Sequence, residues 1–299
     1  MPVLKTSVYL PEGLKRRLAR FARDHHQSEA ELIRQAIENR LGPTEEETSR
    51  PVEPPVPGRL VGIGVGPGPA DLLTTRALTA LRRADRVVAP CTSPDAVGRA
   101  EAIVREAAPD VAVERMVFVM VADQAARADA LAEVCARVSD YLDDGDEVGF
   151  ITLGDPNVYS TVSSVMAGVR ARRPHTTVET IPGIMAFQAL AGAGDVVLTD
   201  EQQSMVLLAA NASTDAIETE LADPQRTVII YKGGGRIGAV ADRLERAARL
   251  DRAVLGELIG MPGERITAVA DVRDRPASYL SSVISPAPQG GGPTPEVTR

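Results

Sequence analysis

Residues 59–69 read Arg-Leu-Val-Gly-Ile-Gly-Val-Gly-Pro-Gly-Pro, an apolar run that passes into a turn of glycine and proline. The apolar run over 59–64 predicts a buried strand, and ligands of α/β proteins bind where such strands end. The spacing does not fit a dinucleotide-binding turn, because the third glycine position, counted from Gly62 or from Gly64, holds a proline. No Gly-Lys-Ser/Thr follows, which argues against a P-loop. The two prolines remove amide donors, so the turn suits recognition by shape better than a phosphate cradle.

Downstream of this turn, apolar runs alternate with amphipathic stretches. Strands are predicted at 59–64, 86–90, 112–118, 147–153, 177–181, 205–210, 227–231 and 253–258. Helices are predicted at 70–84, 95–107, 123–142, 158–172, 183–193 and 236–249. This alternation predicts an α/β fold with largely parallel strand pairing.

Three more glycine-bearing turns follow predicted strands. They are Leu153-Gly154-Asp155-Pro156-Asn157-Val158-Tyr159-Ser160-Thr161, Ile181-Pro182-Gly183-Ile184-Met185-Ala186 and the weaker Tyr231-Lys232-Gly233-Gly234-Gly235. Two interpretations of Asp155 stay open. Its carboxylate could accept hydrogen bonds from a ligand, or it could cap a helix that begins at Pro156.

Charge divides the chain into a basic start and an acidic body. Residues 1–42 hold eight Lys/Arg and five Asp/Glu, a net charge of +3. Residues 43–57 contain five prolines and four glutamates and predict an extended linker. The body, residues 58–286, is acidic. The end of the chain, from Pro286 to Arg299, is expected to be disordered, and residues 287–299 are assigned to this tail.

Residues 1–42 predict one strand and two helices. Residues 5–10 alternate polar and apolar side chains, and Pro11 stops that strand. Ser28 with Glu31 forms a capping-box pattern that opens the second helix. The apolar positions expected to face inward are Leu14, Leu18 and Phe21 on the first helix and Leu32, Ile33, Ala36, Ile37 and Leu41 on the second. A segment this short cannot bury a sufficient core alone, so it is expected to dimerise.

This pattern resembles the ribbon-helix-helix repressors over about 40 residues. The resemblance implies that Lys5, Ser7 and Tyr9 enter the DNA major groove from a two-chain ribbon. It also implies that the start of the second helix, near Ser28, holds a phosphate. The alternative is an arm that dimerises and never contacts DNA.

The composition excludes several classes of protein. At 44% hydrophobic and 25% charged residues the chain is typical of globular proteins. It has no apolar run of about 18 residues and no apolar leader, so we expect a cytoplasmic protein without membrane contact. The two cysteines, Cys91 and Cys135, lack metal-ligand spacing, so no disulfide framework and no metal are expected. A net charge of −8 argues against DNA binding by the whole surface.

Taken in order, Gly-x-Gly-Pro-Gly, then Gly-Asp-Pro, then Pro-Gly-Ile resemble the tetrapyrrole methylases across the body. Three segments look most like the branch that methylates C20 of precorrin-2: the run from Gly154 to Thr161, residues 114–121 and residues 194–201. The resemblance implies two α/β domains, 58–173 and 178–286, with S-adenosylmethionine in the cleft between them. The implied cofactor residues are Pro67, Leu153, Gly154, Asp155, Val158, Thr161, Met185, Ala186 and Lys232. The chain departs from the family pattern at Pro69, where an acidic residue is usual, and at Lys232.

The implied chemistry is direct methyl transfer to a carbon, followed by proton removal from C20. The base is unassigned, with Asp123, Tyr159 and Glu201 as candidates. A substrate rich in carboxylates needs a local basic cleft, for which Arg99, Arg105 and Arg115 are candidates. Cys91 is expected to be a small buried residue without a nucleophilic role.

Several alternatives stay open at this point. The target could be another corrin position, the sirohaem step, or cobalt-factor II in place of metal-free precorrin-2. The chain could instead be a DNA-binding regulator that senses S-adenosylmethionine or a tetrapyrrole. The resemblance to both families implies a homodimer.

Overall fold

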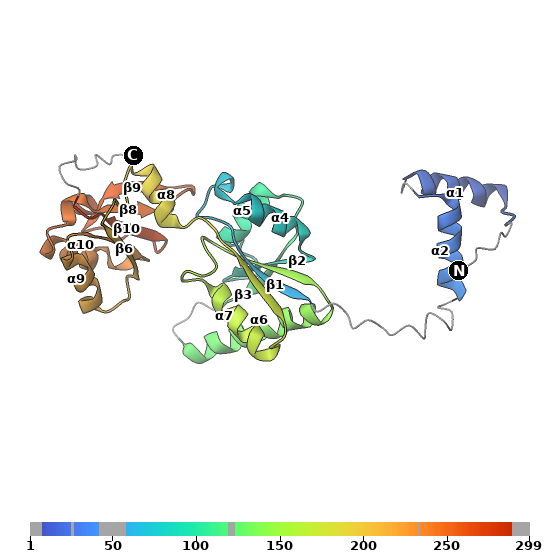
Figure 1. The fold of residues 1–299 in the computed structure, drawn as a ribbon, viewed down its shortest axis with the longest axis horizontal. Helices are drawn as coiled ribbons and strands as arrows, with labels where there is room; N and C mark the ends of the chain where they lie inside the picture. The colour runs from blue at the N-terminus through green and yellow to red at the C-terminus, as the bar shows by residue number, and fades with distance from the viewer. Residues whose placement is uncertain (1–7, 25–26, 42–57, 119–122, 233, 289–299) are drawn as a thin grey trace. The chain divides into compact units, whose positions relative to one another are not determined.

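The computed structural model describes residues 8–24, 27–41, 58–118, 123–232 and 234–288 (Figure 1). The chain divides into two compact units, Met1–Pro55 and Val56–Arg299, which are described separately. In the described residues, no helix has the length and apolar character that crossing a membrane requires.

The first unit contains α1 (Glu12–Asp24) and α2 (Glu29–Leu41). The Ser28 hydroxyl accepts a hydrogen bond from the Glu31 amide at 3.1 Å, which confirms the predicted cap of α2. Lys5 and Ser7 of the predicted strand lie outside the described residues. Residues 8–10 form no strand, because ladder hydrogen bonds need a second strand and one chain offers none.

The two helices leave much of their apolar surface uncovered. Leu14, Phe21 and Ile37 are 47%, 50% and 46% exposed, although they were expected to face inward. Ala22 is the buried apolar residue of this unit among those described. Two helices are too small to cover these side chains without a further surface.

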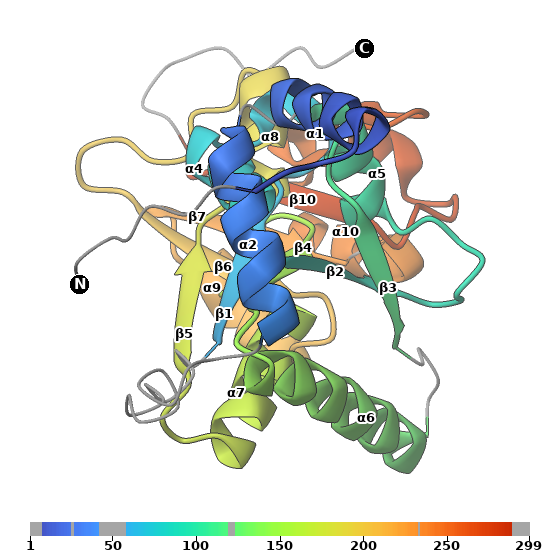
Figure 2. The same ribbon diagram turned by 90° about the vertical axis from the view of Figure 1, so that its right-hand side faces the viewer.

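The first sheet of the second unit is a parallel sheet between two helical layers (Figures 1 and 2). Its strands are β1 (Arg59–Gly64), β2 (Arg86–Cys91), β3 (Val113–Val117), β4 (Glu147–Thr152) and β5 (Thr177–Ile181), in the order β3-β2-β4-β1-β5. The helices are α4 (Thr75–Arg83), α5 (Arg99–Ala107), α6 (Gln124–Asp143) and α7 (Thr161–Arg172). In β1, Leu60 packs in the cluster of α6 and α7, whereas Val61 and Ile63 pack in that of α4 and α5. Such a strand is buried on both faces and reads as a continuous apolar run.

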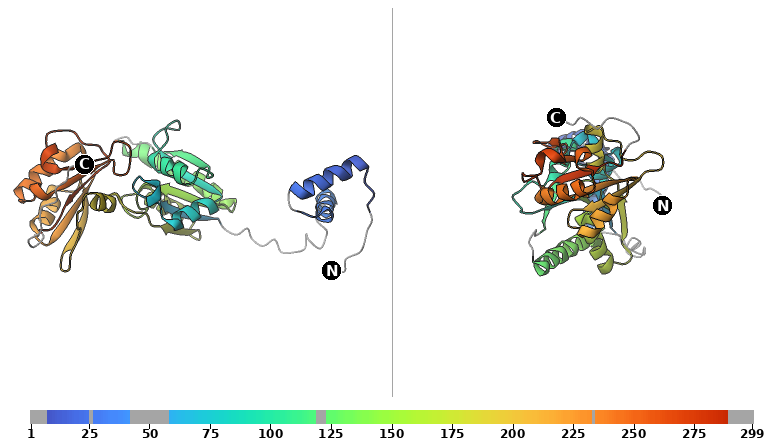
Figure 3. Two further views of the ribbon diagram at one scale, coloured as in Figure 1. Left: turned by 90° about the horizontal axis from the view of Figure 1, so that it is seen from above. Right: turned by 90° about the vertical axis from the view of Figure 1, so that its left-hand side faces the viewer.

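The second sheet is mixed (Figure 3). Its strands are β6 (Ser204–Ala209), β7 (Arg226–Tyr231), β8 (Val254–Glu257), β9 (Arg265–Ala268) and β10 (Ser281–Ser285), in the order β6-β7-β10-β8-β9. Its helices are α8 (Ala186–Ala193), α9 (Thr214–Ala222) and α10 (Ile237–Arg246). Ile229 packs with α8 on one face, whereas Val228 and Ile230 pack with α9 and α10 on the other.

Several predictions for the second unit were wrong. We did not predict α9, β9 or β10, and we expected largely parallel pairing, whereas β10 pairs antiparallel with both β7 and β8. The predicted start of the disordered tail lies too early in the chain. Ala287 is buried, and its amide donates to the Thr227 hydroxyl at 2.9 Å. The predicted helix over 70–84 is divided, with a 3-10 turn at Ala70–Leu72 ahead of α4.

The turns that follow β1, β4 and β5 approach one another through their backbones. A Cβ atom on Gly64 would lie 2.5 Å from the Gly154 carbonyl oxygen and 2.6 Å from the Gly183 amide nitrogen. The Gly154 amide donates to the Gly66 carbonyl at 2.7 Å. Gly64 and Gly183 therefore require glycine, because the backbone atoms that a Cβ would meet cannot move aside as the end of a flexible side chain can.

We therefore expect Gly64→Ala to lower the free energy of unfolding by about 2 kcal/mol, since the added methyl group overpacks a backbone contact. Gly192→Ala is the matched control. Gly192 lies in α8 with open space around its Cα, and alanine there is expected to add up to about 1 kcal/mol. Urea unfolding followed by circular dichroism measures both. Equal stability of Gly64→Ala and the unsubstituted chain would contradict the packing described here.

Candidate functional site

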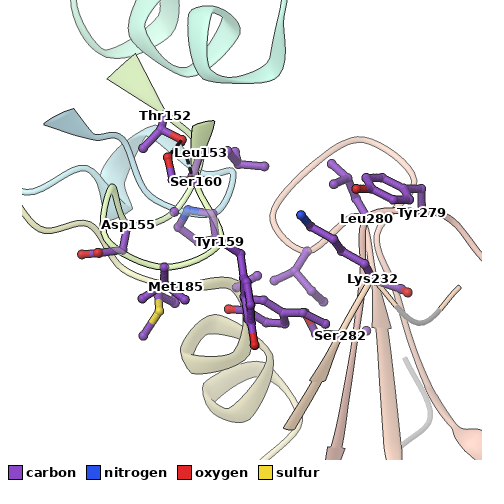
Figure 4. Close-up of a pocket in the computed structure, with 18 of the residues that line it drawn as sticks. Thr152, Leu153, Asp155, Tyr159, Ser160, Met185, Lys232, Tyr279, Leu280 and Ser282 are labelled. Carbon is purple, nitrogen blue, oxygen red and sulfur yellow. Dashed lines mark hydrogen bonds between the residues drawn. The ribbon is translucent and has the colours of Figure 1, made fainter. Parts of the chain in front are cut away.

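A cavity of about 270 Å³ opens between the turns of the first sheet and the strand ends of the second (Figure 4). All nine residues predicted to hold the cofactor line it: Pro67, Leu153, Gly154, Asp155, Val158, Thr161, Met185, Ala186 and Lys232. The further lining residues are Thr152, Tyr159, Ser160, Tyr231, Gly256, Leu258, Ile259, Met261, Tyr279, Leu280, Ser281 and Ser282. The volume is near the lower end of the range of small-molecule sites, roughly 300 Å³.

Asp155 joins two turns that are distant in sequence. One carboxylate oxygen accepts from the Asn157 amide at 2.8 Å, and the other accepts from the Gly183 amide at 3.1 Å. The helix expected from residue 158 begins at Thr161, with Ser160 as its cap. The capping interpretation of Asp155 is therefore wrong, and its two oxygens fix the shape of the cavity wall.

Lys232, Leu258 and Tyr159 hold left-handed backbone conformations around the cavity. Their φ angles are 61°, 53° and 48°. A non-glycine residue in this region costs about 1–3 kcal/mol, and such residues cluster at functional sites. Hydrogen bonds to the segment that enters β10 stabilise two of them. The Lys232 amide donates to the Ser281 carbonyl at 2.9 Å, and the Leu258 amide donates to the Leu280 carbonyl at 3.1 Å.

Two polar groups of the second sheet differ in how they are satisfied. The Tyr231 hydroxyl accepts from the Phe187 amide at 3.3 Å, and burial raises the pKa of Tyr231 to about 12. Tyr231 therefore stays a neutral phenol at physiological pH. The Ser281 hydroxyl is buried and has no hydrogen-bond partner among the described residues. A buried hydroxyl without a partner is costly, and a bound ligand would satisfy it.

A buried carboxylate holds the segment that carries Tyr279. Glu257 is fully buried, and its oxygens accept from Arg275 at 2.7 Å and from the Ser278 amide at 2.8 Å. Arg265 adds a third bond at 3.3 Å. A buried charge with several partners is held in one position, so the cavity wall next to it is preorganised.

The candidate bases do not gather at the cavity. Tyr159 lines it, and its hydroxyl donates to the Leu207 carbonyl at 3.4 Å. Asp123 instead caps α6 by accepting from the Ala125 amide at 2.9 Å, and Glu201 lies in a turn before β6. Neither is among the described lining residues, while residues 119–122 lie outside the description.

The three arginines proposed for a basic cleft are not among the described residues that line the cavity. Arg105 and Arg115 both bind Glu101, which is fully buried and contacts them at 2.6 and 2.7 Å. The hydrogen bond from Arg115 is the main cause that lowers the pKa of Glu101. Arg99 lies 2.9 Å from the sulfur of Met261, which lines the cavity. Helical spacing placed Glu101 and Arg105 four residues apart and could have indicated this pairing.

The predicted burial of Cys91 is confirmed. Its side chain is buried, and its thiol donates to the Met116 carbonyl at 3.4 Å. Burial raises the pKa of this thiol, which disfavours the nucleophilic thiolate.

Sequence comparisons place this geometry in a known family. The family model of the tetrapyrrole (corrin/porphyrin) methylases matches residues 59–273, and that of ribbon-helix-helix proteins of the copG family matches residues 5–42. Two curated relatives are 29% identical: the cobalt-precorrin-2 C(20)-methyltransferase of Salmonella typhimurium over 232 residues, and a precorrin-2 C(20)-methyltransferase of Sinorhizobium sp over 238. The matches cover 76% and 77% of this chain, and 95% of each relative.

Solved structures show the same fold. A cobalt precorrin-4 methyltransferase has a TM-score of 0.58 at 21% identity, covering 76% of this chain and 94% of the other. The uroporphyrin-III C-methyl transferase of Thermus thermophilus, complexed with S-adenosyl homocysteine, has a TM-score of 0.55 at 19% identity, covering 76% and 97%. The chain belongs to the tetrapyrrole (corrin/porphyrin) methylases, a family of S-adenosylmethionine-dependent methyltransferases.

Proposed function

We propose that the second unit transfers a methyl group from S-adenosylmethionine to C20 of precorrin-2 or of its cobalt complex, a step of cobalamin synthesis. The observation that carries the proposal is the single cavity that collects all nine predicted cofactor residues. The two C(20)-methyltransferases matched along 95% of their length support the position of methylation. Their equal identity does not favour either the metal-free or the cobalt-containing substrate.

The lining residues fit this cofactor. A Cβ on Gly154 would enter open space, so glycine leaves room there for a ligand. Leu153, Val158 and Ile259 offer an apolar wall to a nucleoside. The unpartnered Ser281 hydroxyl offers a hydrogen bond in a buried position. When bound, S-adenosylmethionine supplies a methyl group on a cationic sulfur.

In this proposal the residues of the chain mainly orient the reactants. One wall of the cavity is fixed by the backbone contact among Gly64, Gly154 and Gly183, and the hydrogen bond from the Gly183 amide to Asp155 supports it. A fixed wall holds the methyl group and its acceptor carbon at a set distance. Tyr231 stays neutral and adds no charge near the cationic sulfur. Tyr159 is the first candidate for accepting the C20 proton, because it lines the cavity. The other two candidates, Asp123 and Glu201, are not among the described lining residues.

We take 58–173 and 178–286 as the two domains that enclose the cofactor. The support for this division is that the lining residues come from both sheets. Pro67 and Leu153 belong to the first sheet's turns, whereas Lys232 and Ser281 belong to the second sheet.

The test uses the full chain, S-adenosylmethionine labelled with ¹³C in its methyl group, and precorrin-2 or cobalt-precorrin-2 as the methyl acceptor. We expect the label at C20 of one or both products, as read by NMR. Label at another carbon would contradict the C20 assignment while leaving the methylase assignment intact. No labelled product from either substrate would contradict the proposed reaction.

A second function is favoured by the match of residues 5–42 to ribbon-helix-helix proteins. We infer that two copies pair through the half-exposed apolar residues of α1 and α2 and bind DNA through Lys5, Ser7 and Tyr9. Tyr9 is 97% exposed in the single chain and is free to enter a groove. The net charge of +3 per arm is small, but pairing doubles it.

We expect the full chain to select a palindromic sequence from random DNA, because a two-fold dimer reads two half-sites. Replacing Lys5, Ser7 and Tyr9 together by alanine should weaken binding to the selected DNA at least about tenfold, as measured by fluorescence anisotropy. The same variant should keep its methylation rate. Failure to select any sequence would leave dimerisation as the role of the arm, and a response of DNA binding to S-adenosylhomocysteine would favour a regulator.

A further inference from the structure

Lys232 is the only lysine between residues 58 and 299, where the remaining basic residues are arginines. Among the described residues that line the cavity, Asp155 and Lys232 are the charged ones. The oxygens of Asp155 already accept from two backbone amides. Neutral amides leave the Asp155 carboxylate negative, so Lys232 is the positive charge among the described lining residues.

The ammonium group of Lys232 has no hydrogen bond or ion pair with the described residues. Its recorded contact is the ring of Tyr279, with the nitrogen 5.9 Å from the ring centroid. Neighbouring cations differ from it, because Arg265 and Arg275 both bind Glu257. Lys232 lies at an exposed position, so the group remains available to an anion.

The backbone around Lys232 directs its side chain. A φ of 61° is unfavourable for lysine, and the bond from its amide to the Ser281 carbonyl stabilises that conformation. Figure 4 shows the side chain extending away from the second sheet, with its nitrogen near Leu280 and Tyr279. The residue with the unfavourable φ angle is thus the same residue that places an ammonium group on the rim of the cavity.

Two exposed aromatic rings share this rim. Tyr159 is 50% exposed and Tyr279 is 55% exposed, and both line the cavity. Aromatic faces suit a flat conjugated macrocycle, and an ammonium suits a carboxylate on its periphery. The buried, unpartnered Ser281 hydroxyl and the open space at Gly154 suit the smaller cofactor.

We propose that the ammonium group of Lys232 binds a side-chain carboxylate of the tetrapyrrole, while Tyr159 and Tyr279 contact its macrocycle. The backbone of Lys232 stays among the groups predicted to hold the cofactor. The proposal rests on the proposed function and adds a residue that orients the substrate. Both the tetrapyrrole and S-adenosylmethionine carry carboxylates, so the test must separate the two sources. The exposed position of Lys232 favours the tetrapyrrole, whose acid groups lie on the outside of a large ring.

The probes are uroporphyrin III, its fully methylated ester and S-adenosylhomocysteine, each titrated into the full chain. Lys232→Met should weaken the binding of uroporphyrin III about tenfold, which is the loss expected for one charge-assisted hydrogen bond. Lys232→Arg should restore most of that affinity, because it keeps the charge. The ester should bind the unsubstituted chain and Lys232→Met equally.

Arg236→Met is the matched control, since it removes one exposed positive charge four residues away and outside the cavity lining. It should leave uroporphyrin III binding within about twofold, because surface charges outside the site are screened. Unchanged binding in Lys232→Met would overturn the proposal, and so would failure of the unsubstituted chain to bind uroporphyrin III. Weakened binding of S-adenosylhomocysteine alone would assign Lys232 to the cofactor instead. Because these are binding measurements, they distinguish failure of this proposal from failure of C20 methylation.

Discussion

The close approach of Gly64, Gly154 and Gly183 is the constraint on which the site depends. Any side chain at Gly64 would meet backbone atoms of Gly154 and Gly183. The turns after β1, β4 and β5 can therefore come together only because residue 64 has no side chain. Asp155 then ties the second turn to the third by accepting from the Gly183 amide. One wall of the cavity is thus made from backbone, which gives it a shape that rotation of side chains does not change.

The second sheet provides the opposite wall, which is held by residues in left-handed conformations and by one buried carboxylate. Lys232 and Leu258 hold left-handed conformations, and both amides donate to carbonyls of the segment entering β10. Glu257 is buried behind that segment and holds it through Arg275 and the Ser278 amide. The two walls therefore differ in chemistry. The first combines backbone and apolar side chains with the Asp155 carboxylate and the ring of Tyr159, whereas the second carries Lys232 and the ring of Tyr279.

Strands buried on both faces could be predicted from sequence, because runs such as residues 60–64 are apolar throughout and alternate with amphipathic helices. That the nine predicted cofactor residues line one cavity could be expected from the family resemblance carried by three ordered glycine turns. β10 could not, since Ser281–Ser285 is short and serine-rich and has no periodic signal, although every residue is buried. The role of Asp155 also escaped prediction, because its partner Gly183 is 28 residues away and only the folded chain brings them together.

The central claim is that the cavity between the two walls binds the methyl donor of the tetrapyrrole methylases. Isothermal titration calorimetry of the full chain with S-adenosylhomocysteine tests it most directly. We expect one site per chain with a dissociation constant in the micromolar range, about −8 kcal/mol of binding free energy. Heats indistinguishable from those of buffer alone would contradict the cofactor site, and with it the assignment of the nine residues that converge on the cavity.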